Sequence, residues 1–391
     1  MRLLVLLTLF ASFAAHAQII LLRGGGSNGA SAPSSNGVVA ANATVTQNSV
    51  CTLGSGNPLI TPSFYMEIGD ATGRLWSYQV GSVYATTGEP AASASKLQYA
   101  MYIAAKRNGY ANFTAADIAA LNFTDGYNNM GSVTTGNQCP PSGTIASCLL
   151  LTGTIDNTHL NNYQNPSAIG KFDYDAGHQE NHAAQYQSEL VNASTASIYP
   201  LFVTAYGLAG PYGQYAQPLM SGGLQTSAAH YAAVLKQVLN SAAMISILGK
   251  NQVCAWKPSV GGGCVGGVYF DPISGTYQSP IGSMWHYSIG HWVEDDATQN
   301  NDQSFSSPGA FGGYPWFQPT CPTAAHPGNV CWSQAEVIAD GTTIKYYGIL
   351  WRSAPSGSSP TGNGQASGAC AALVRHAWNT GVQQTGAIPV H

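Results

Sequence analysis

Apolar residues recur with two different periods along this chain of 391 residues. Apolar and polar positions alternate over residues 64–70 and 74–81, with a turn at 71–73 between them, and this pattern predicts a β-hairpin. A helical stretch over 97–109 follows the hairpin region. From about residue 112 to 251 the apolar spacing is mainly helical, and we expect helices at 115–121, 178–192 and 226–248.

After Cys264 the pattern changes to short aromatic segments punctuated by glycine. These segments predict strands at 268–270, 285–293, 311–317 and 343–351, then a loop rich in Ser, Gly and Pro at 353–368 and a last helix at 369–378. Strands at both ends of the chain around a helical middle predict a sheet that both termini complete.

The N-terminal residues have the pattern of an export signal. A charged start, an apolar run from Leu3 to Ala15 and the small-residue motif Ala15-His16-Ala17 predict a signal peptide over residues 1–17, cleaved before Gln18. The Gly- and Ser-rich residues that follow predict a flexible leader over 18–37. The apolar run is too short for a comfortable membrane span, and we expect no later span. The sequence therefore predicts a secreted or periplasmic protein.

The eight cysteines favour disulfides, because an even number in an exported chain is typical of a disulfide framework. Spacing suggests three short bridges and leaves two distant residues to pair: Cys139–Cys148, Cys254–Cys264, Cys321–Cys331 and the long closure Cys51–Cys370. Because the chain has no C-x-x-C motif, we expect no zinc site.

Charge is sparse, since Asp, Glu, Lys and Arg make up 8% of the residues and the formal net charge is −4. A chain without a basic stripe cannot neutralise many phosphates, which argues against nucleic-acid binding. The composition favours an uncharged or mixed small-molecule substrate. It leaves the oligomeric state open.

The run Ser93-Ala94-Ser95-Lys96 opens the helical stretch at 97–109 and places a serine three residues before a lysine. On a helix, positions i and i+3 share a face, so the Lys96 amine can reach the Ser93 hydroxyl. A partly desolvated lysine can accept the proton of a serine nucleophile. The alternative is structural: Ser93 or Ser95 caps an amphipathic helix and Lys96 is solvated in its first turn.

His178, Glu180 and His182 alternate in a way that suggests metal ligands. Their spacing, however, is neither H-E-x-x-H nor its inverted form, and no further ligand is evident. We therefore expect no metal and no other cofactor. His178 remains a candidate pocket residue because it closely follows Tyr174.

Four stretches, in order, resemble the serine β-lactamase and penicillin-binding-protein superfamily, especially its class C and esterase-like branch. Ser93-x-x-Lys96 is similar to the first active-site motif of that family. The other three are the stretch 171–177, which contains Tyr174, the Gly-Gly-Leu turn with its following helix at 222–232, and the third motif with the strand behind it at 307–317.

The resemblance implies a β-lactamase-like fold of the α/β (α+β) class, with an antiparallel sheet built from both termini, flanked by helices, and an inserted helical lobe. Residues 38–391 would form one domain, with the α/β lobe at about 38–92 and 265–391 and the helical lobe at about 93–264. The active site would lie in the cleft between the two lobes.

The resemblance also implies roles for individual residues. Ser93 would be the nucleophile, and Lys96 and Tyr174 would handle its proton, with cationic neighbours lowering the pKa of Tyr174. The oxyanion hole would consist of the Ser93 backbone N–H and one from the strand residues Gly309, Ala310 and Phe311, with Ser307 and His178 beside the substrate.

Two departures from the family pattern bear on the substrate. Ala176 stands where the family has an asparagine, and Ser307-Pro308-Gly309 stands where it has Lys-Thr-Gly or His-x-Gly. The cation that would meet a β-lactam carboxylate is therefore missing. We expect a secreted carboxylesterase-like hydrolase of uncharged esters or amides. The alternatives are a β-lactamase or D-amino-acid peptidase, and a relative that binds ligands without catalysis.

Overall fold

The computed structural model describes residues 35–52, 62–131, 139–258, 264, 266–280, 285–294, 304–320, 343–353 and 360–386. The predicted signal peptide, the predicted leader up to residue 34 and the predicted pair Cys321–Cys331 lie outside the described residues.

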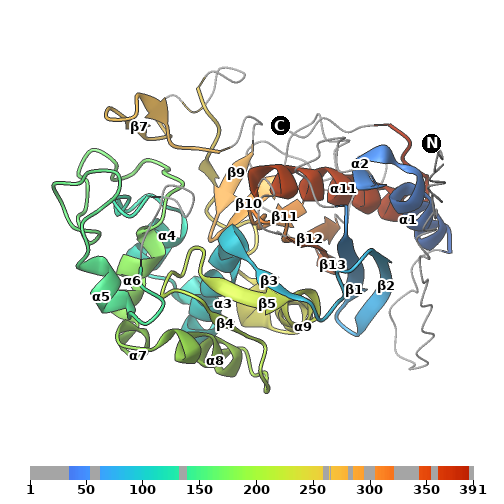
Figure 1. Cartoon of the computed structure of the whole chain (residues 1–391), viewed down its shortest axis with the longest axis horizontal. Coiled ribbons are helices and arrows are strands. Elements are labelled where there is room, and N and C mark those ends of the chain that lie inside the picture. Colours follow the sequence, from blue (N-terminus) through green and yellow to red (C-terminus); the bar gives the residue numbers. More distant parts are fainter. Residues whose placement is uncertain are drawn as a thin grey trace, which may run out of the picture.

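One large antiparallel sheet dominates the described structure (Figure 1). Its strands follow the order β2-β1-β13-β12-β11-β10-β9-β6, so the second strand from one edge, β1, pairs with the last strand of the chain, β13. The prediction of a sheet completed by both termini is confirmed. The strand bounds are β1 Phe64–Asp70, β2 Gly73–Val80, β6 Val253–Cys254, β9 His286–Ser288, β10 His291–Glu294, β11 Ser304–Ser306, β12 Tyr314–Thr320 and β13 Thr343–Arg352.

The predicted hairpin at 64–81 is confirmed, and its turn has a local cause. The Asp70 carboxylate accepts hydrogen bonds from the backbone N–H groups of Thr72 (2.8 Å) and Gly73 (3.2 Å). Gly73 has φ 141°, a conformation that a residue without a Cβ adopts at little cost. The turn therefore fixes the register between β1 and β2.

Helices cover both faces of this sheet. α1 (Ser35–Gln47), α2 (Ser49–Thr52) and α11 (Pro360–Thr380) pack together, and a core that includes Val45, Met66 and Trp378 lies between them and the sheet. α9 (Ala228–Leu239) contacts β1 and β13. Figure 1 shows the first and last helices, blue and red, side by side. No helix within the described ranges has the length and apolar content that a bilayer crossing requires.

The middle of the chain forms a mainly helical region beside the sheet, drawn in cyan to yellow-green in Figure 1. It contains α3 Ser95–Arg107, α4 Ala115–Leu121, α5 Ile145–Leu149, α6 His178–Tyr186, α7 Ser188–Val191, α8 Thr195–Ala205, α10 Ala242–Ile245 and the 3-10 turns η2 Ala92–Ala94 and η3 Tyr110–Asn112. A small sheet of β3 Gly88–Pro90, β5 Leu224–Ser227 and β4 Gly213–Tyr215 joins it, and β7 Phe270–Asp271 pairs with β8 Thr276–Tyr277.

Several predicted boundaries were wrong. The predicted strand at 285–293 is a hairpin, because Gly290 with φ 76° turns the chain between β9 and β10. The helix predicted from 226 begins at Ala228, since Ser227 caps it, and it ends at Leu239 before α10. The helix predicted over 178–192 is interrupted at Gln187. The predicted loop at 353–368 is already helical from Pro360.

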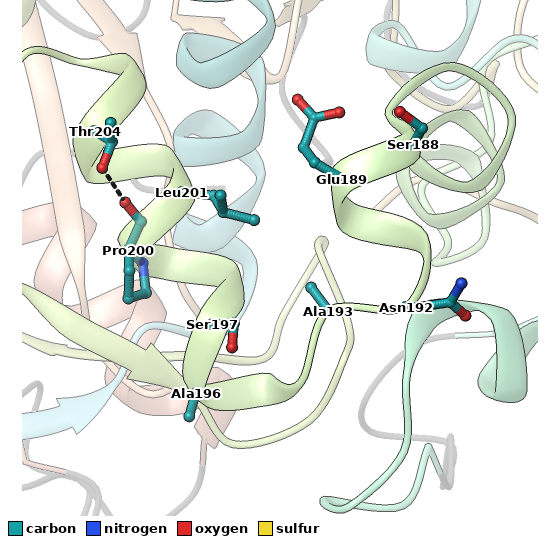
Figure 2. A pocket seen from close by; sticks show the side chains of 9 residues that line it. All are labelled: Ser188, Glu189, Asn192, Ala193, Ala196, Ser197, Pro200, Leu201 and Thr204. Carbon is teal, nitrogen blue, oxygen red and sulfur yellow. Dashed lines mark hydrogen bonds between the residues drawn. The ribbon is translucent and has the colours of Figure 1, made fainter.

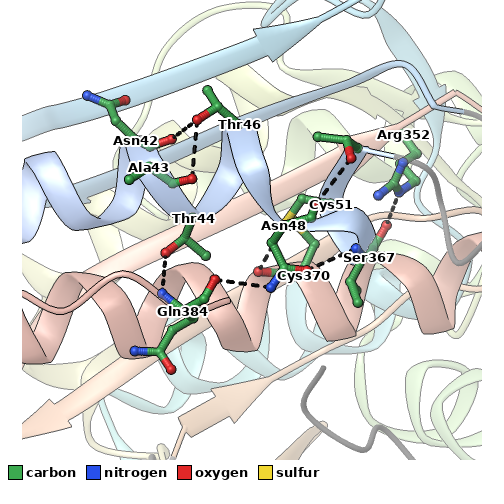
Figure 3. The surroundings of a disulfide bond; sticks show 12 residues. Asn42, Ala43, Thr44, Thr46, Asn48, Cys51, Arg352, Ser367, Cys370 and Gln384 are labelled. Carbon is green, nitrogen blue, oxygen red and sulfur yellow. Dashed lines mark hydrogen bonds between the residues drawn. A yellow bond between two sulfur atoms is a disulfide. The ribbon is translucent and has the colours of Figure 1, made fainter. Parts of the chain in front are cut away.

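Disulfides join segments that are far apart and segments that are close in sequence. Cys51 on α2 is bonded to Cys370 on α11 across a sequence separation of 319, and Cys139–Cys148 and Cys254–Cys264 form the predicted short loops. Figure 3 shows the long bridge between the two helices, with Asn48 and Thr44 hydrogen-bonded to the Gln384 backbone nearby. This bridge therefore fastens the terminal helices to each other.

The long bridge should contribute more to stability than a short one. Restricting a loop across a separation of 319 is worth about 6 kcal/mol in the chain-entropy model, against about 2–3 kcal/mol for Cys139–Cys148 with a separation of 9. We expect Cys51→Ala/Cys370→Ala to lower the urea midpoint more than Cys139→Ala/Cys148→Ala. Equal midpoints in non-reducing equilibrium unfolding would contradict this.

Candidate active site

Ser93 lies in the 3-10 turn η2, which leads directly into α3. Its side chain is half-buried, while the residues on either side of it are fully buried. The preceding residue, Ala92, has φ 46°, and a left-handed conformation costs a residue with a Cβ about 1–2 kcal/mol. Such strain persists where the surrounding structure imposes it, and it is concentrated at functional sites. The strained turn therefore fixes the position of Ser93 just before the first residue of α3.

Lys96 occupies the first turn of α3 and is 6% exposed. Its Nζ donates hydrogen bonds to Ser93 Oγ at 3.0 Å and to the Ser221 backbone carbonyl at 2.9 Å, and lies 4.7 Å from the centroid of the Tyr174 ring. Neither η2 nor α3 has a side-chain cap. These contacts contradict the alternative of a capped helix with a solvated lysine.

The electrostatics of this pair suit proton transfer. Burial lowers the pKa of Lys96 to about 8, and the negative charges of Glu180 and Asp175 oppose that decrease. With this pKa, roughly a tenth of the Lys96 amines are neutral at pH 7. A neutral amine 3.0 Å from a serine hydroxyl can accept its proton, so the pair has the chemistry of an activated nucleophile.

Tyr174 lies beside the same pair but differs from the prediction in its ionisation. Burial raises its pKa to about 12, and hydrogen bonds with Ser93 and Trp292 only partly oppose this increase. The expectation of a lowered pKa for Tyr174 is therefore wrong, because desolvation of the phenolate outweighs the hydrogen bonds that oppose it. At neutral pH the phenol keeps its proton, which makes it a donor.

The segment predicted to supply the second oxyanion donor is a turn between β11 and β12, not a strand. Ser307 approaches the site, since its Oγ donates to the Ser93 backbone carbonyl at 3.4 Å. The Gly309 N–H already donates to the Gly313 carbonyl at 2.7 Å, which contradicts its predicted role as an oxyanion donor. Ala310 and Phe311 are half-buried in the same turn.

Gly309 nevertheless has a reason to be glycine. A Cβ at this position would overlap the backbone carbonyl oxygen of Ala91, directly before the η2 turn. The close approach of the two backbones brings the β11–β12 turn against the segment that contains Ser93. The turn thus contributes to the site through backbone packing.

His178 was expected to line the pocket, but its ring is fully buried. It stacks on Phe123 with ring centroids 5.0 Å apart, and its Nδ1 pairs with Asp125. The centroid of the Phe123 ring in turn lies 5.8 Å from the Lys96 Nζ. His178 therefore packs behind the Phe123 ring that faces the Lys96 amine. No cluster of three metal-ligating side chains occurs among the residues whose positions the structure gives.

Sequence reasoning missed Ser221 and the role of Glu180. Ser221 holds Lys96 through its backbone carbonyl, which leaves no signature in a sequence. Glu180 is fully buried and bonds to Ser221, although its alternation with two histidines suggested metal binding. Its position three residues after Gly177, at the start of α6, is a capping-box spacing that indicates a structural role.

A separate groove of about 580 Å³ lies between α7 and α8, and Figure 2 shows the side chains along it. Glu189, Asn192 and Leu201 are among the residues that line it, and none of the lining residues belongs to the Ser93 site. The groove therefore lies apart from the Ser93 site.

No protein-family model and no curated protein sequence match this chain. Among solved structures it is similar to a putative β-lactamase from Bacteroides dorei (17% identity, 81% of this chain and 94% of that one, TM-score 0.46). It is also similar to a β-lactamase/D-alanine carboxypeptidase from Yersinia pestis (12%, 87% and 99%, 0.43) and to a mutant simvastatin synthase from Aspergillus terreus (11%, 88% and 98%, 0.41). Two of these three structures are described as β-lactamases.

The pKa of Lys96 predicts the pH dependence of Ser93 reactivity. Protonated Lys96 cannot accept a proton, so labelling of Ser93 by an uncharged fluorophosphonate should rise about tenfold per pH unit below pH 8 and level off above it. Lys96→Met should slow labelling by about 10²–10⁴-fold.

The matched control is Lys106→Met, which removes an exposed lysine on the same helix that pairs with Glu189. It should leave both the rate and the profile unchanged. Rates are corrected for spontaneous hydrolysis of the reagent at each pH. A profile without a rise between pH 6 and pH 8 would contradict the assignment of Lys96 as the base.

Proposed function

We propose that the protein is a serine hydrolase that works through an acyl-enzyme formed on Ser93. The observation that carries the proposal is the 3.0 Å contact between the Ser93 hydroxyl and a buried Lys96 amine whose pKa is lowered to about 8. A buried lysine beside a half-buried serine, preceded by a strained backbone residue, is the arrangement that nucleophilic catalysis needs.

The reaction begins when neutral Lys96 takes the Ser93 proton as Oγ bonds to the substrate carbonyl carbon. The resulting tetrahedral intermediate collapses when the bond to the leaving group breaks, and the leaving group takes the proton held by Lys96, either directly or through the phenol of Tyr174, which gives up its own proton and takes the one from Lys96. Water then attacks the acyl-enzyme with Lys96 again accepting a proton. Ser93 recovers its proton as the acid product departs.

We propose uncharged esters or amides as the substrate class. Ala176 and Ser307 support this choice, because neither can supply a charge to a substrate carboxylate. Losing one charge-assisted hydrogen bond costs about 1.5–3 kcal/mol, which is roughly one to two orders of magnitude in kcat/KM. β-Lactam and D-amino-acid substrates, which carry a carboxylate, would be handicapped by that amount.

The identity of the nucleophile is tested by mass spectrometry. A fluorophosphonate should add one label to Ser93, and Ser93→Ala should abolish both the label and hydrolysis. The matched variant is Ser95→Ala, because Ser95 is fully buried and accepts a hydrogen bond from the Leu224 N–H at 3.2 Å. Ser95→Ala should still be labelled. A folded wild-type protein that takes no label would favour the non-catalytic ligand-binding alternative.

The substrate class is tested by comparing turnover of p-nitrophenyl esters with that of nitrocefin. We expect kcat/KM for a short-chain ester to exceed that for nitrocefin by at least about tenfold, because no cation at position 307 binds the nitrocefin carboxylate. If nitrocefin were hydrolysed faster than every ester tested, the β-lactamase alternative would replace the esterase proposal.

A further inference from the structure

Glu180 is fully buried in the first turn of α6, and each of its carboxylate oxygens has a defined partner. Oε2 accepts the Gly177 N–H at 2.8 Å. Oε1 accepts both the backbone N–H of Ser221 at 2.8 Å and its Oγ at 2.9 Å. One carboxylate therefore connects the start of α6 to the segment before β5.

The Ser221 residue held in this way is the one whose carbonyl accepts a hydrogen bond from Lys96. Its N–H and hydroxyl face Glu180, and its C=O lies 2.9 Å from the Lys96 Nζ. The two ends of the same residue thus bond to a buried acid and a buried base. A displacement of Ser221 would remove one of the two polar contacts that aim the Lys96 amine at Ser93.

Glu180 also acts on Lys96 through its charge. The charged and titratable groups that face the amine are Glu180 from α6 and Asp175 and Tyr174 from the segment before it. Glu180 has the larger electrostatic effect of the two carboxylates, and it raises the pKa of Lys96 against the decrease caused by burial.

We propose that Glu180 is a positioning residue for the reaction at Ser93, acting through Ser221 to hold the Lys96 amine in place. The inference rests on the proposed function of Ser93. It goes beyond that function because Glu180 touches neither the substrate nor the reacting atoms. It also gives a role to the His178-Gln179-Glu180-Asn181-His182 pattern that does not involve a metal.

The test measures the rate of fluorophosphonate labelling between pH 6 and pH 10 for wild type and Glu180→Gln. Glutamine keeps an acceptor for Ser221 but loses the charge and the Gly177 contact. We expect the labelling rate on the high-pH plateau to fall about tenfold or more, because Lys96 is held less well. We also expect the rising limb of the rate–pH profile to move to lower pH by about one unit, because Lys96 loses a neighbouring negative charge. A general loss of structure would lower the labelled fraction without moving the limb.

A second readout does not depend on activity. In protein labelled with ¹³C at the lysine Cε, the shift of Lys96, assigned with Lys96→Met, reports its pKa directly. Glu180→Gln should lower that pKa, and an unchanged pKa with an unchanged plateau would overturn the inference. If wild type takes no label on Ser93, the proposed function fails, while the resonance still shows whether Glu180 controls Lys96.

Two further variants complete the experiment. Glu189→Gln removes a glutamate that pairs with Lys106 and Tyr102, and it should leave rate and limb unchanged. Ser221→Ala removes one donor to Glu180 and keeps all charges, so it should lower the plateau about threefold without moving the limb. If Glu180→Gln does not fold, the test rests on Ser221→Ala. A plateau labelling rate in Ser221→Ala equal to that of the wild type would contradict the inference.

Discussion

Everything at the candidate site depends on keeping a lysine amine buried at the start of a helix. Taking a charged ammonium out of water is costly unless polar groups surround it, and here Ser93 Oγ and the Ser221 carbonyl accept its hydrogen bonds while the Tyr174 ring covers another side. Because the contacts compensate the burial incompletely, the pKa of Lys96 falls to about 8. Because burial destabilises the ammonium, a fraction of the Lys96 amines is neutral near neutral pH and can accept a proton.

The backbone around Lys96 is packed closely enough to maintain this arrangement. Ala92 is held at φ 46°, and Gly309 lies where a Cβ would overlap the Ala91 carbonyl. A Cβ on Gly290 would lie 3.0 Å from the Lys96 carbonyl oxygen and closer still to the Ala100 side chain. Turns of the large sheet therefore approach the segment around Ser93 and Lys96 with backbone at two places, which leaves little freedom for Ser93 to move away from Lys96.

The distant ends of the chain contribute to this rigidity indirectly. β11 reaches the site as part of the same sheet in which β1 pairs with β13, and α1, α2 and α11 cover one face of that sheet. The bridge Cys51–Cys370 joins two of these helices. The order of the sheet thus connects the termini to the site through continuous hydrogen-bonded strands.

The sequence by itself determined the features that local spacing controls. These include the β1–β2 hairpin with its turn at 71–73, α4 with its bounds, the i, i+3 relation of Ser93 and Lys96, and the pairing of nearby cysteines. The sequence missed α1 and α8, because α1 has β-branched residues and asparagine, and α8 has Pro200 in its interior. Both are poor helix formers in isolation, so tertiary packing stabilises these helices.

Only the tertiary structure decided how the candidate site is held. The Lys96 amine donates to the main-chain carbonyl of Ser221, which is 125 residues away in the sequence. Glu180, the acid that bonds to Ser221, alternates with two histidines, and this spacing suggested metal ligands. The ionisation of Tyr174 depends on how much water its ring excludes, and the Gly309 N–H is occupied because the chain turns there. Main-chain acceptors and desolvation arise from the folded surroundings of a residue, whereas a sequence pattern records side-chain types and spacings. The sequence therefore identified the Ser93–Lys96 pair, and the fold decided its geometry and charge.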